Sequence, residues 1–305
     1  MEENWGVIGH EKNIQLLDWS LKNDKLAHAY FFSGLPNLGK TLVAEEFAKK
    51  ILGTQNAWNL DVHKLELNEE EHQEITIEQA QEWRRLLFLK PLSGKKKIGI
   101  IYGAENLNEE SSNALLKIIE EPAEGTIILI IASGSGVVLP TIISRSQILK
   151  FLPVKEETIL TALLQKIKNE DLAKECVELS AGRPGLALRL AENKKFFNSV
   201  KSYKDLAENI LQKDAINFWP RQEKMFKRQE NFIGKSREAY AVVEQLEILL
   251  RDSLLQEYNL KSTSTQAKSF PSNIERAIGV INKAKVDLES NIQPKLILEN
   301  LFINL

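Results

Sequence analysis

The first half of the chain alternates short apolar runs with stretches of helical periodicity. The runs "AYFFS" (29–33), "IGIIY" (98–102) and "GTIILIIAS" (125–133) are almost continuously apolar. Runs of this kind are typical of strands that are buried on both faces of a parallel sheet. A further run, "QILKFLP" (147–153), is predicted to complete the sheet. This alternation of strands and helices predicts an α/β fold.

Helices are predicted between these strands. "KTLVAEEFAKKILG" (40–53) has apolar residues at helical spacing and ends in glycine. "NEESSNALLKIIEEP" (108–122) is expected to form a helix, because Asn108 can cap its first turn and Pro122 can close it. "LPTIISR" (139–145) predicts a brief helix with a proline in its first turn.

Beyond Pro153 the pattern becomes helical. The segments "KEETILTALLQKIKNE", "LAKECVELSAG" and "PGLALRLAEN" predict a small unit of three helices. From about residue 200 onward the apolar repeats have helical spacing. We therefore predict three domains: an α/β domain at residues 1–152, a small helical domain at 153–198 and an all-α domain at 199–305.

Composition and charge narrow the class of protein. A length of 305 residues favours more than one hydrophobic core. The net charge of −2 excludes a dedicated polybasic nucleic-acid binder, and "GKKK" (94–97) is predicted to be a solvated turn. The single cysteine, Cys176, excludes an internal disulfide and a cysteine-rich zinc module. The N-terminus lacks a signal-peptide pattern, and the longest apolar run (126–132) is too short to cross a bilayer, so we expect a cytoplasmic protein without membrane contact.

The stretch "GLPNLGKT" (34–41) has the spacing G-x-x-x-x-G-K-[ST] of a phosphate-binding loop. A predicted strand precedes it and a predicted helix follows it, as this motif requires. Lys40 would reach the β- and γ-phosphates of ATP or ADP, and the Thr41 hydroxyl would help to hold Mg²⁺. The candidate phosphate-binding residues are Gly34, Asn37, Gly39, Lys40 and Thr41. A simpler alternative is that the loop only caps a helix or binds a stray anion.

The strand that should supply acidic residues for hydrolysis does not do so. Hydrolysis at such a loop needs a carboxylate to hold Mg²⁺ and a group to orient the attacking water. At the end of "IGIIY" the chain has Tyr102 and Gly103 instead. Glu105 comes later and is expected to point elsewhere unless the strand end is rearranged. The sequence therefore predicts no dedicated metal ligands and little hydrolysis of its own.

Several motifs together resemble a known family. "DKLAHAYFFSGLPNLGKT", "NEESSNALLKIIEEPAEGTIILI", "VVLPTIISRS" and "AGRPGLAL" are similar to segments of bacterial clamp-loader subunits of the AAA+ superfamily, and in particular to the δ′ class of DNA polymerase III. The resemblance covers roughly residues 5 to 190. It implies an AAA+ P-loop domain, a small helical lid domain and a helical collar domain.

The resemblance also implies an assembly and a division of labour within it. Such subunits form a hetero-pentameric ring with gamma/tau-like motor subunits and a delta-like subunit, and the ring loads the sliding clamp onto primer–template DNA. Motor subunits carry an Asp-Glu pair where Tyr102 and Gly103 stand, and an arginine where "AGRPGLAL" has Gly185. The family commonly carries a four-cysteine zinc module, which this chain lacks, so no zinc is expected. These departures favour the non-motor class.

Two further sets of residues follow from the resemblance. "SRS" (144–146) matches the family's serine–arginine–cysteine motif, which implies that Arg145 is an arginine finger acting in trans on a neighbour's ATP. Val7 and Ile8 lie where relatives place the adenine pocket. The simpler alternatives are an ordinary surface arginine with an ion-pair partner and two plain core residues.

We therefore expect a non-motor clamp-loader subunit of DNA polymerase III. The alternatives left open are an active ATPase motor subunit or another AAA+ ATPase that uses Glu105, and a stand-alone nucleotide-binding switch.

Overall fold

A computed structural model of the chain describes residues 5–54, 60–68, 74–92, 94, 96–134, 138–227, 231–257, 274–290 and 292–305. The chain forms two compact units, residues 1–191 and 192–305, and each is considered by itself. The predicted three-domain division, with boundaries after residues 152 and 198, stays a prediction.

The first unit is built on a parallel sheet of five strands in the order β2-β3-β4-β1-β5. The strands are β1 (Ala29–Ser33), β2 (Val62–Leu65), β3 (Lys97–Ile101), β4 (Thr126–Ala132) and β5 (Gln147–Lys150). All residues of β1, β3 and β4 are buried, as their apolar runs predict. The edge strand β2 was not predicted. The predicted α/β parallel fold is confirmed.

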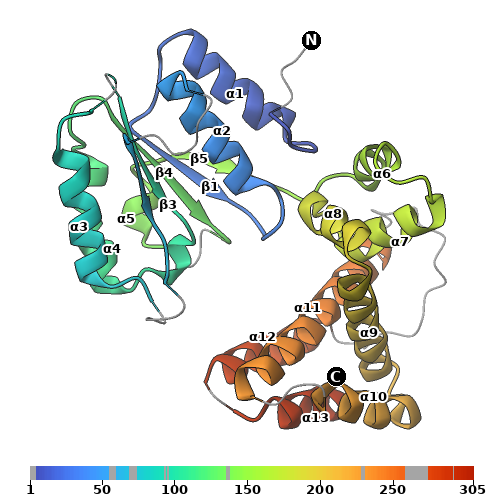
Figure 1. The fold of residues 1–305 in the computed structure, drawn as a ribbon. Helices are drawn as coiled ribbons and strands as arrows, with labels where there is room; N and C mark the ends of the chain where they lie inside the picture. The colour runs from blue at the N-terminus through green and yellow to red at the C-terminus, as the bar shows by residue number, and fades with distance from the viewer. Residues whose placement is uncertain are drawn as a thin grey trace. The chain divides into compact units, whose positions relative to one another are not determined.

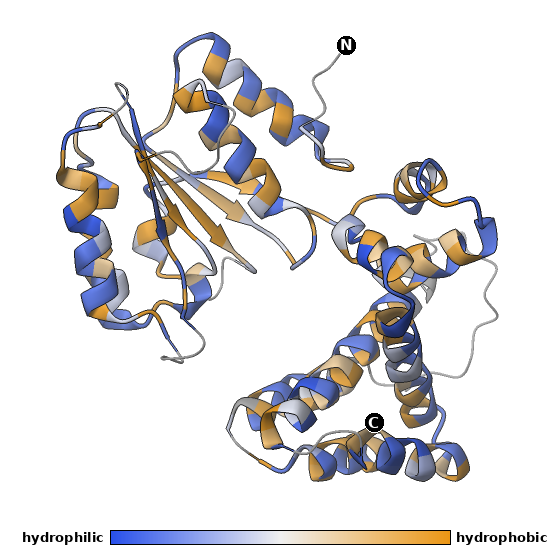
Figure 2. Cartoon of the chain, viewed as in Figure 1, coloured by the Kyte–Doolittle hydropathy of each residue, from blue (hydrophilic) through white to orange (hydrophobic). Residues whose placement is uncertain are grey.

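Helices cover both faces of this sheet (Figure 1). The helices of the unit are α1 (Glu11–Lys22), α2 (Lys40–Leu52), α3 (Ile77–Phe88), the 3₁₀ turn η1 (Ala104–Asn106), α4 (Glu109–Glu120), α5 (Pro140–Ile143), α6 (Glu156–Leu164), α7 (Glu170–Ser180) and α8 (Pro184–Glu192). Alternate residues of each strand point to opposite faces. Phe32 therefore packs with α1 and α2, whereas its neighbour Phe31 packs with α3 and α4. Figure 2 shows the apolar strands between helices with polar outer faces.

Helix boundaries follow the predicted signals. Asn108 caps α4 by accepting a hydrogen bond of 2.9 Å from the Ser111 N–H. Gly53 ends α2 in a left-handed conformation with φ of 63°. Thr76 and Gln79 form a capping box at the start of α3.

The second unit consists of helices within its described residues. These are α9 (Lys194–Leu211), α10 (Ala215–Lys227), α11 (Phe232–Glu257), α12 (Ile274–Glu289) and α13 (Pro294–Asn304). Their apolar faces meet in one core, in which the fully buried Phe218 ring stacks on Phe302 with 4.5 Å between ring centroids. In the described parts of the chain, no helix is both long enough and apolar enough to cross a membrane.

Candidate functional site

The segment 34–39 leaves the end of β1 in a backbone conformation that depends on glycine. A Cβ atom at Gly34 would lie 2.2 Å from the carbonyl oxygen of Phe151, because β5 runs alongside. Gly39 has φ of 92° and Asn37 has φ of 63°, both in the left-handed region. Gly39 is then the N-cap of α2, so the loop delivers its backbone to a helix N-terminus, where anions bind favourably.

Lys40 lies buried within this loop, with 7% of its surface exposed. Its Nζ donates hydrogen bonds to the carbonyl oxygens of Gly34 at 2.5 Å and Leu35 at 2.7 Å. Burial lowers the pKa of Lys40 to about 8, and the charge of Glu105 opposes this shift. The next residue, Thr41, is exposed in the first turn of α2. An ammonium group, a hydroxyl and a helix N-terminus therefore gather at the carboxyl ends of the strands, which suits a phosphate.

Tyr102, at the end of β3, is directed to the side of α2. Its hydroxyl donates a hydrogen bond of 2.7 Å to Glu45 Oε1. Lys64 Nζ lies 3.7 Å from the same oxygen and 5.2 Å from the centroid of the Tyr102 ring. Burial, together with the neighbouring Glu45, raises the pKa of Tyr102. The end of β3 therefore supplies a neutral phenol that is already bonded to α2.

Glu105 does come near the loop, although the sequence favoured another direction. Gly103 adopts φ of 61° and starts η1, so the chain turns directly after β3. Glu105 Oε2 then accepts a hydrogen bond of 3.1 Å from the N–H of Ser133, just beyond β4. Its charge raises the pKa of Lys40 against the effect of burial. The turn after β3 is thus the rearrangement of the strand end that would let Glu105 face the loop.

Val7 and Ile8 lie beside the loop. Val7 is buried in the core, and its Cγ1 lies 2.8 Å from the position that a Cβ at Gly39 would occupy. Both residues also line a groove between α1 and α6. Val7 is therefore buried where the groove meets the loop, and Ile8, which is half-buried, lies at the edge of this open groove.

A residue that the sequence analysis did not single out, His10, also belongs to this region. Its ring packs on Phe151 with 4.6 Å between ring centroids. A hydrogen bond links it to the backbone of Leu38 in the loop, and burial lowers the pKa of its imidazole. The backbone of His10 is left-handed, with φ of 66°, but this feature cannot be read from the sequence, so no sequence pattern marked the residue.

The segment "AGRPGLAL" contacts the loop through its backbone. The Gly185 N–H donates a hydrogen bond of 2.9 Å to the carbonyl oxygen of Asn37. A Cβ atom at Gly185 would also lie only 2.9 Å from that oxygen. The chain therefore has direct backbone contact between α8 and the loop.

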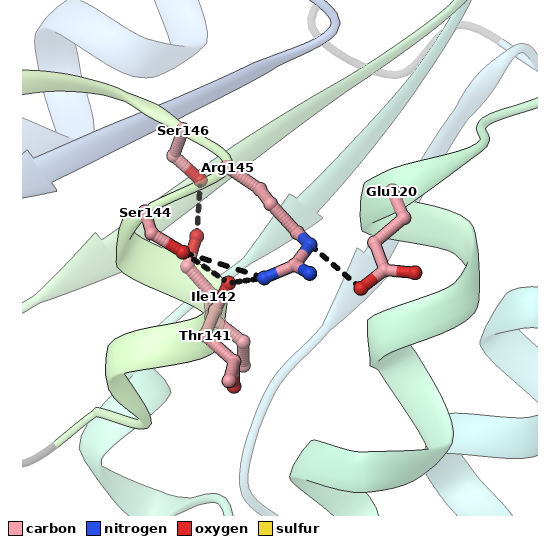
Figure 3. Close-up of polar contacts among 6 residues, drawn as sticks. All are labelled: Glu120, Thr141, Ile142, Ser144, Arg145 and Ser146. Carbon is pink, nitrogen blue, oxygen red and sulfur yellow. Dashed lines mark hydrogen bonds and ion pairs between the residues drawn. The ribbon is translucent and has the colours of Figure 1, made fainter.

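Arg145 lies just after α5 and is partly exposed (Figure 3). Its Nε is 2.6 Å from Glu120 Oε1, at the end of α4. Its Nη1 donates to the carbonyl oxygen of Thr141 at 3.0 Å and lies 3.3 Å from Ser144 Oγ. Ser146 Oγ donates to the Ile142 carbonyl oxygen at 2.9 Å, so the residue in the cysteine's place helps to close the turn. The guanidinium is thus both ion-paired and accessible.

The single cysteine of the chain, Cys176, lies outside this site. Cys176 is buried in α7, and burial raises the pKa of its thiol to about 11.

Comparison with known proteins shows which proteins the chain is similar to. The family model described as "DNA polymerase III, delta subunit" matches residues 9–155. DNA polymerase III subunit delta' of Bacillus subtilis is 26% identical over 96% of this chain and 94% of its own length. DNA polymerase III subunit tau/gamma of Haemophilus influenzae is 29% identical, but over only 54% of this chain and 26% of its own length.

A solved structure supports the fold. A gamma subunit-related protein of DNA polymerase III from Thermotoga maritima superposes with a TM-score of 0.56 at 16% identity, covering 94% of this chain and 97% of that one. In sequence the chain is thus similar to subunit delta' of DNA polymerase III over most of its length, and the family model covers just under half of it.

Proposed function

We propose that the chain is a non-motor, δ′-type subunit of a clamp loader and that it lends Arg145 to the ATPase site of a neighbouring gamma/tau-like subunit. The observation that carries the proposal is the position of Tyr102. At the end of β3, the hydroxyl of this residue is bonded to Glu45 on α2, and by the resemblance this is the position where motor subunits carry an acid that holds their metal.

The loss of that carboxylate has an energetic consequence. Electrostatic groups that stabilise a phosphoryl-transfer transition state are typically worth a few kcal/mol each. Tyr102 and Gly103 replace both acids, and the backbone of Gly185 occupies the place of the third group, the arginine. With three such groups missing, the chain's own site is expected to turn over slowly or not at all.

Arg145 has the properties that a finger in trans requires. It is accessible, its charge is permanent, and a guanidinium can donate a charge-assisted hydrogen bond to a phosphoryl oxygen. A guanidinium supplied to a partner's site can raise its rate by roughly 10³–10⁵. The chain would therefore act on ATP that another subunit holds.

The loop of this chain keeps the groups that would bind a nucleotide. The backbone at Gly34, Asn37 and Gly39 would surround phosphates, Lys40 would pair with them, and Thr41 would reach a magnesium ion that accompanies them. Val7 and Ile8 would contact the base. A bound nucleotide would supply a triphosphate or diphosphate that stabilises the loop, whereas the chemistry would take place at the neighbouring subunit. In the assembled ring, the remaining partners would be a delta-like subunit, the sliding clamp and primer–template DNA.

The test is an ATPase assay of a reconstituted complex. The chain is mixed with the motor and delta-like subunits of its own organism, and ATP hydrolysis is measured for the unmodified chain, Lys40→Ala and Arg145→Ala. We expect the isolated chain to be nearly inert, the complex to be stimulated, and Arg145→Ala to remove the stimulation while Lys40→Ala keeps most of it. An Arg145→Ala complex as active as the unmodified one would overturn the proposal.

A second candidate function rests on Glu105. Its carboxylate interacts electrostatically with Lys40, so it is the candidate to replace the acids that motor subunits use for hydrolysis. If the chain is itself an ATPase that uses Glu105, the isolated chain hydrolyses ATP with Mg²⁺, and Glu105→Gln and Lys40→Ala both abolish that activity.

A further inference from the structure

The ion pair between Arg145 and Glu120 places an acidic residue where a helix disfavours one. Glu120 is the last residue of α4, and helix C-termini carry partial negative charge, so a carboxylate there is unfavourable unless a cation compensates it. Arg145 provides that cation from a different part of the chain, 25 positions further along. The stability of α4 therefore does not explain why a glutamate stands at this position.

Stability gives little reason for it. The side chains of Arg145 and Glu120 are 39% and 41% exposed, and ion pairs that are exposed to this degree contribute little to folding. Their separation of 2.6 Å and the additional hydrogen bond of Nη1 to Thr141 nevertheless fix the guanidinium at two of its three nitrogen atoms.

The third nitrogen atom is the one left for a ligand. Among the described residues, Nη2 of Arg145 has no hydrogen-bond partner, whereas Nε is held by Glu120 and Nη1 by Thr141. Figure 3 shows the guanidinium lying between the end of α4 and the turn after α5, with contacts drawn to Nε and Nη1 and none to Nη2. A guanidinium that is held in this way has lost most of its rotational freedom before a phosphoryl group arrives, so less entropy is lost on contact.

We infer that Glu120 is a positioning residue for the arginine finger, holding Nε so that the outer end of the guanidinium is presented to the phosphoryl group of a neighbouring subunit's ATP. The inference rests on the proposed function of Arg145. It assigns a role to a residue that the sequence marks only as the end of an apolar helix. The finger and its support then come from two different elements, α5 and α4, so the orientation of Arg145 depends on the packing of these helices against the sheet.

The experiment uses the reconstituted complex described above. Steady-state ATP hydrolysis is measured for Glu120→Gln, Arg145→Ala, the double variant and Glu121→Gln. Glu121 is the matched control because it is the next residue, is exposed, and loses the same charge at the same helix end. Thermal unfolding of each variant verifies that the fold is intact.

We expect Glu120→Gln to lower kcat roughly 10- to 100-fold while KM for ATP changes little, because misplacement of a catalytic group weakens transition-state contacts more than binding. Glu121→Gln should behave as the unmodified chain. The double variant should be no slower than Arg145→Ala alone, because Glu120 acts only through the guanidinium that Arg145→Ala removes.

Two outcomes would overturn the inference, and they differ in what they leave standing. If Glu120→Gln is as active as Glu121→Gln, or more active, while Arg145→Ala abolishes the stimulation, then Glu120 does not position the finger and the proposed function survives. If Arg145→Ala is itself fully active, the proposed function fails, and the role of Glu120 fails with it.

Discussion

The hydroxyl of Tyr102 donates a hydrogen bond of 2.7 Å to Glu45 on α2, and Lys64 lies close to both residues. This contact joins the end of β3 to the helix that follows the nucleotide loop. Tyr102 thus takes part in packing and joins two elements of the chain's own fold.

Tyr102→Phe should therefore affect stability and not activity. A hydrogen bond to a charged acceptor contributes about 1.5–3 kcal/mol, and its loss leaves Glu45 with only Lys64. We expect the free energy of unfolding of the first unit to fall by an amount near the lower end of this range, as measured by denaturant titration of the full chain. ATP hydrolysis by the isolated chain should stay at background.

A double-mutant cycle distinguishes this contact from general loss of packing. Tyr102→Phe and Glu45→Met in one chain should cost clearly less than the sum of the two single changes, because both remove the same bond. Additive costs would mean that the bond contributes nothing specific.

Gly185 offers a test of the contact between α8 and the loop. A methyl group at this position would lie 2.9 Å from the Asn37 carbonyl oxygen, which is a backbone atom with little freedom to move. Gly185→Ala should therefore break or lengthen the hydrogen bond between the Gly185 N–H and Asn37 and destabilise the first unit by roughly 1–2 kcal/mol. Hydrogen exchange at the Gly185 amide should become faster.

Gly279 is the control for this substitution. It lies in α12, and no atom would come within 4 Å of an added Cβ. Gly279→Ala should stabilise that helix by about 0.5–1 kcal/mol, because alanine loses less backbone entropy than glycine on entering a helix. If Gly185→Ala and Gly279→Ala both raised the free energy of unfolding, the close approach of α8 to the loop would be contradicted.

The buried ammonium of Lys40 makes stability depend on pH in the alkaline range. Burial lowers its pKa from 10.5 to about 8 in the folded chain. Between these two values the unfolded chain binds more protons than the folded chain, so Lys40 makes the folded state more stable as the pH rises from 8 to 10.5. This contribution is lost as the pH falls through 8.

The comparison with Lys40→Met isolates this contribution from the other groups that titrate at high pH. Lys40→Met should be the more stable protein at pH 7, and its advantage should shrink by up to about 1.4 kcal/mol per pH unit above pH 8. Chemical denaturation at several pH values measures the difference. A constant difference from pH 7 to pH 10 would show that Lys40 keeps its ordinary pKa.

The sequence predicted those parts of the fold whose pattern is set by burial alone. β1, β3 and β4 are buried on both faces, so their runs are continuously apolar and can be recognised without knowing their neighbours. β2 lies at the sheet edge, and its residues "VHKL" include only one that is fully buried, which leaves no such run. α1 was also not assigned, although Ile14 and Leu17 have helical spacing.

The site was predictable in its motifs but not in its tertiary contacts. The spacing of glycine and lysine identified the loop, and "SRS" identified Arg145, because these motifs are local. The partners of the same residues come from distant segments: Glu45 for Tyr102, Ser133 for Glu105 and Glu120 for Arg145. No periodicity in one sequence specifies such pairs.

The basic turn at 94–97 shows a prediction that was wrong for one residue. Lys97 was expected to be solvated, but it is 2% exposed at the start of β3. Its Nζ donates hydrogen bonds to the carbonyl oxygens of Leu86 at 2.9 Å and Leu89 at 2.6 Å, at the C-terminal end of α3. The lysine therefore acts as a C-terminal cap that comes from another element.

This cap leads to a last prediction. Lys97→Met keeps the apolar stem but removes both hydrogen bonds, and it leaves the buried carboxylate of Asp61 without the nearby positive charge. We expect a loss of about 2–3 kcal/mol in the free energy of unfolding, together with faster hydrogen exchange in the last turn of α3. The neighbouring Lys96 is the control, because its ion pair with Asp24 is solvent-exposed on the aspartate side. Lys96→Met should change stability by less than about 0.5 kcal/mol. If Lys97→Met were as stable as Lys96→Met, the buried ammonium of Lys97 would have no structural role. The turn would then behave as the solvated turn that the sequence predicted.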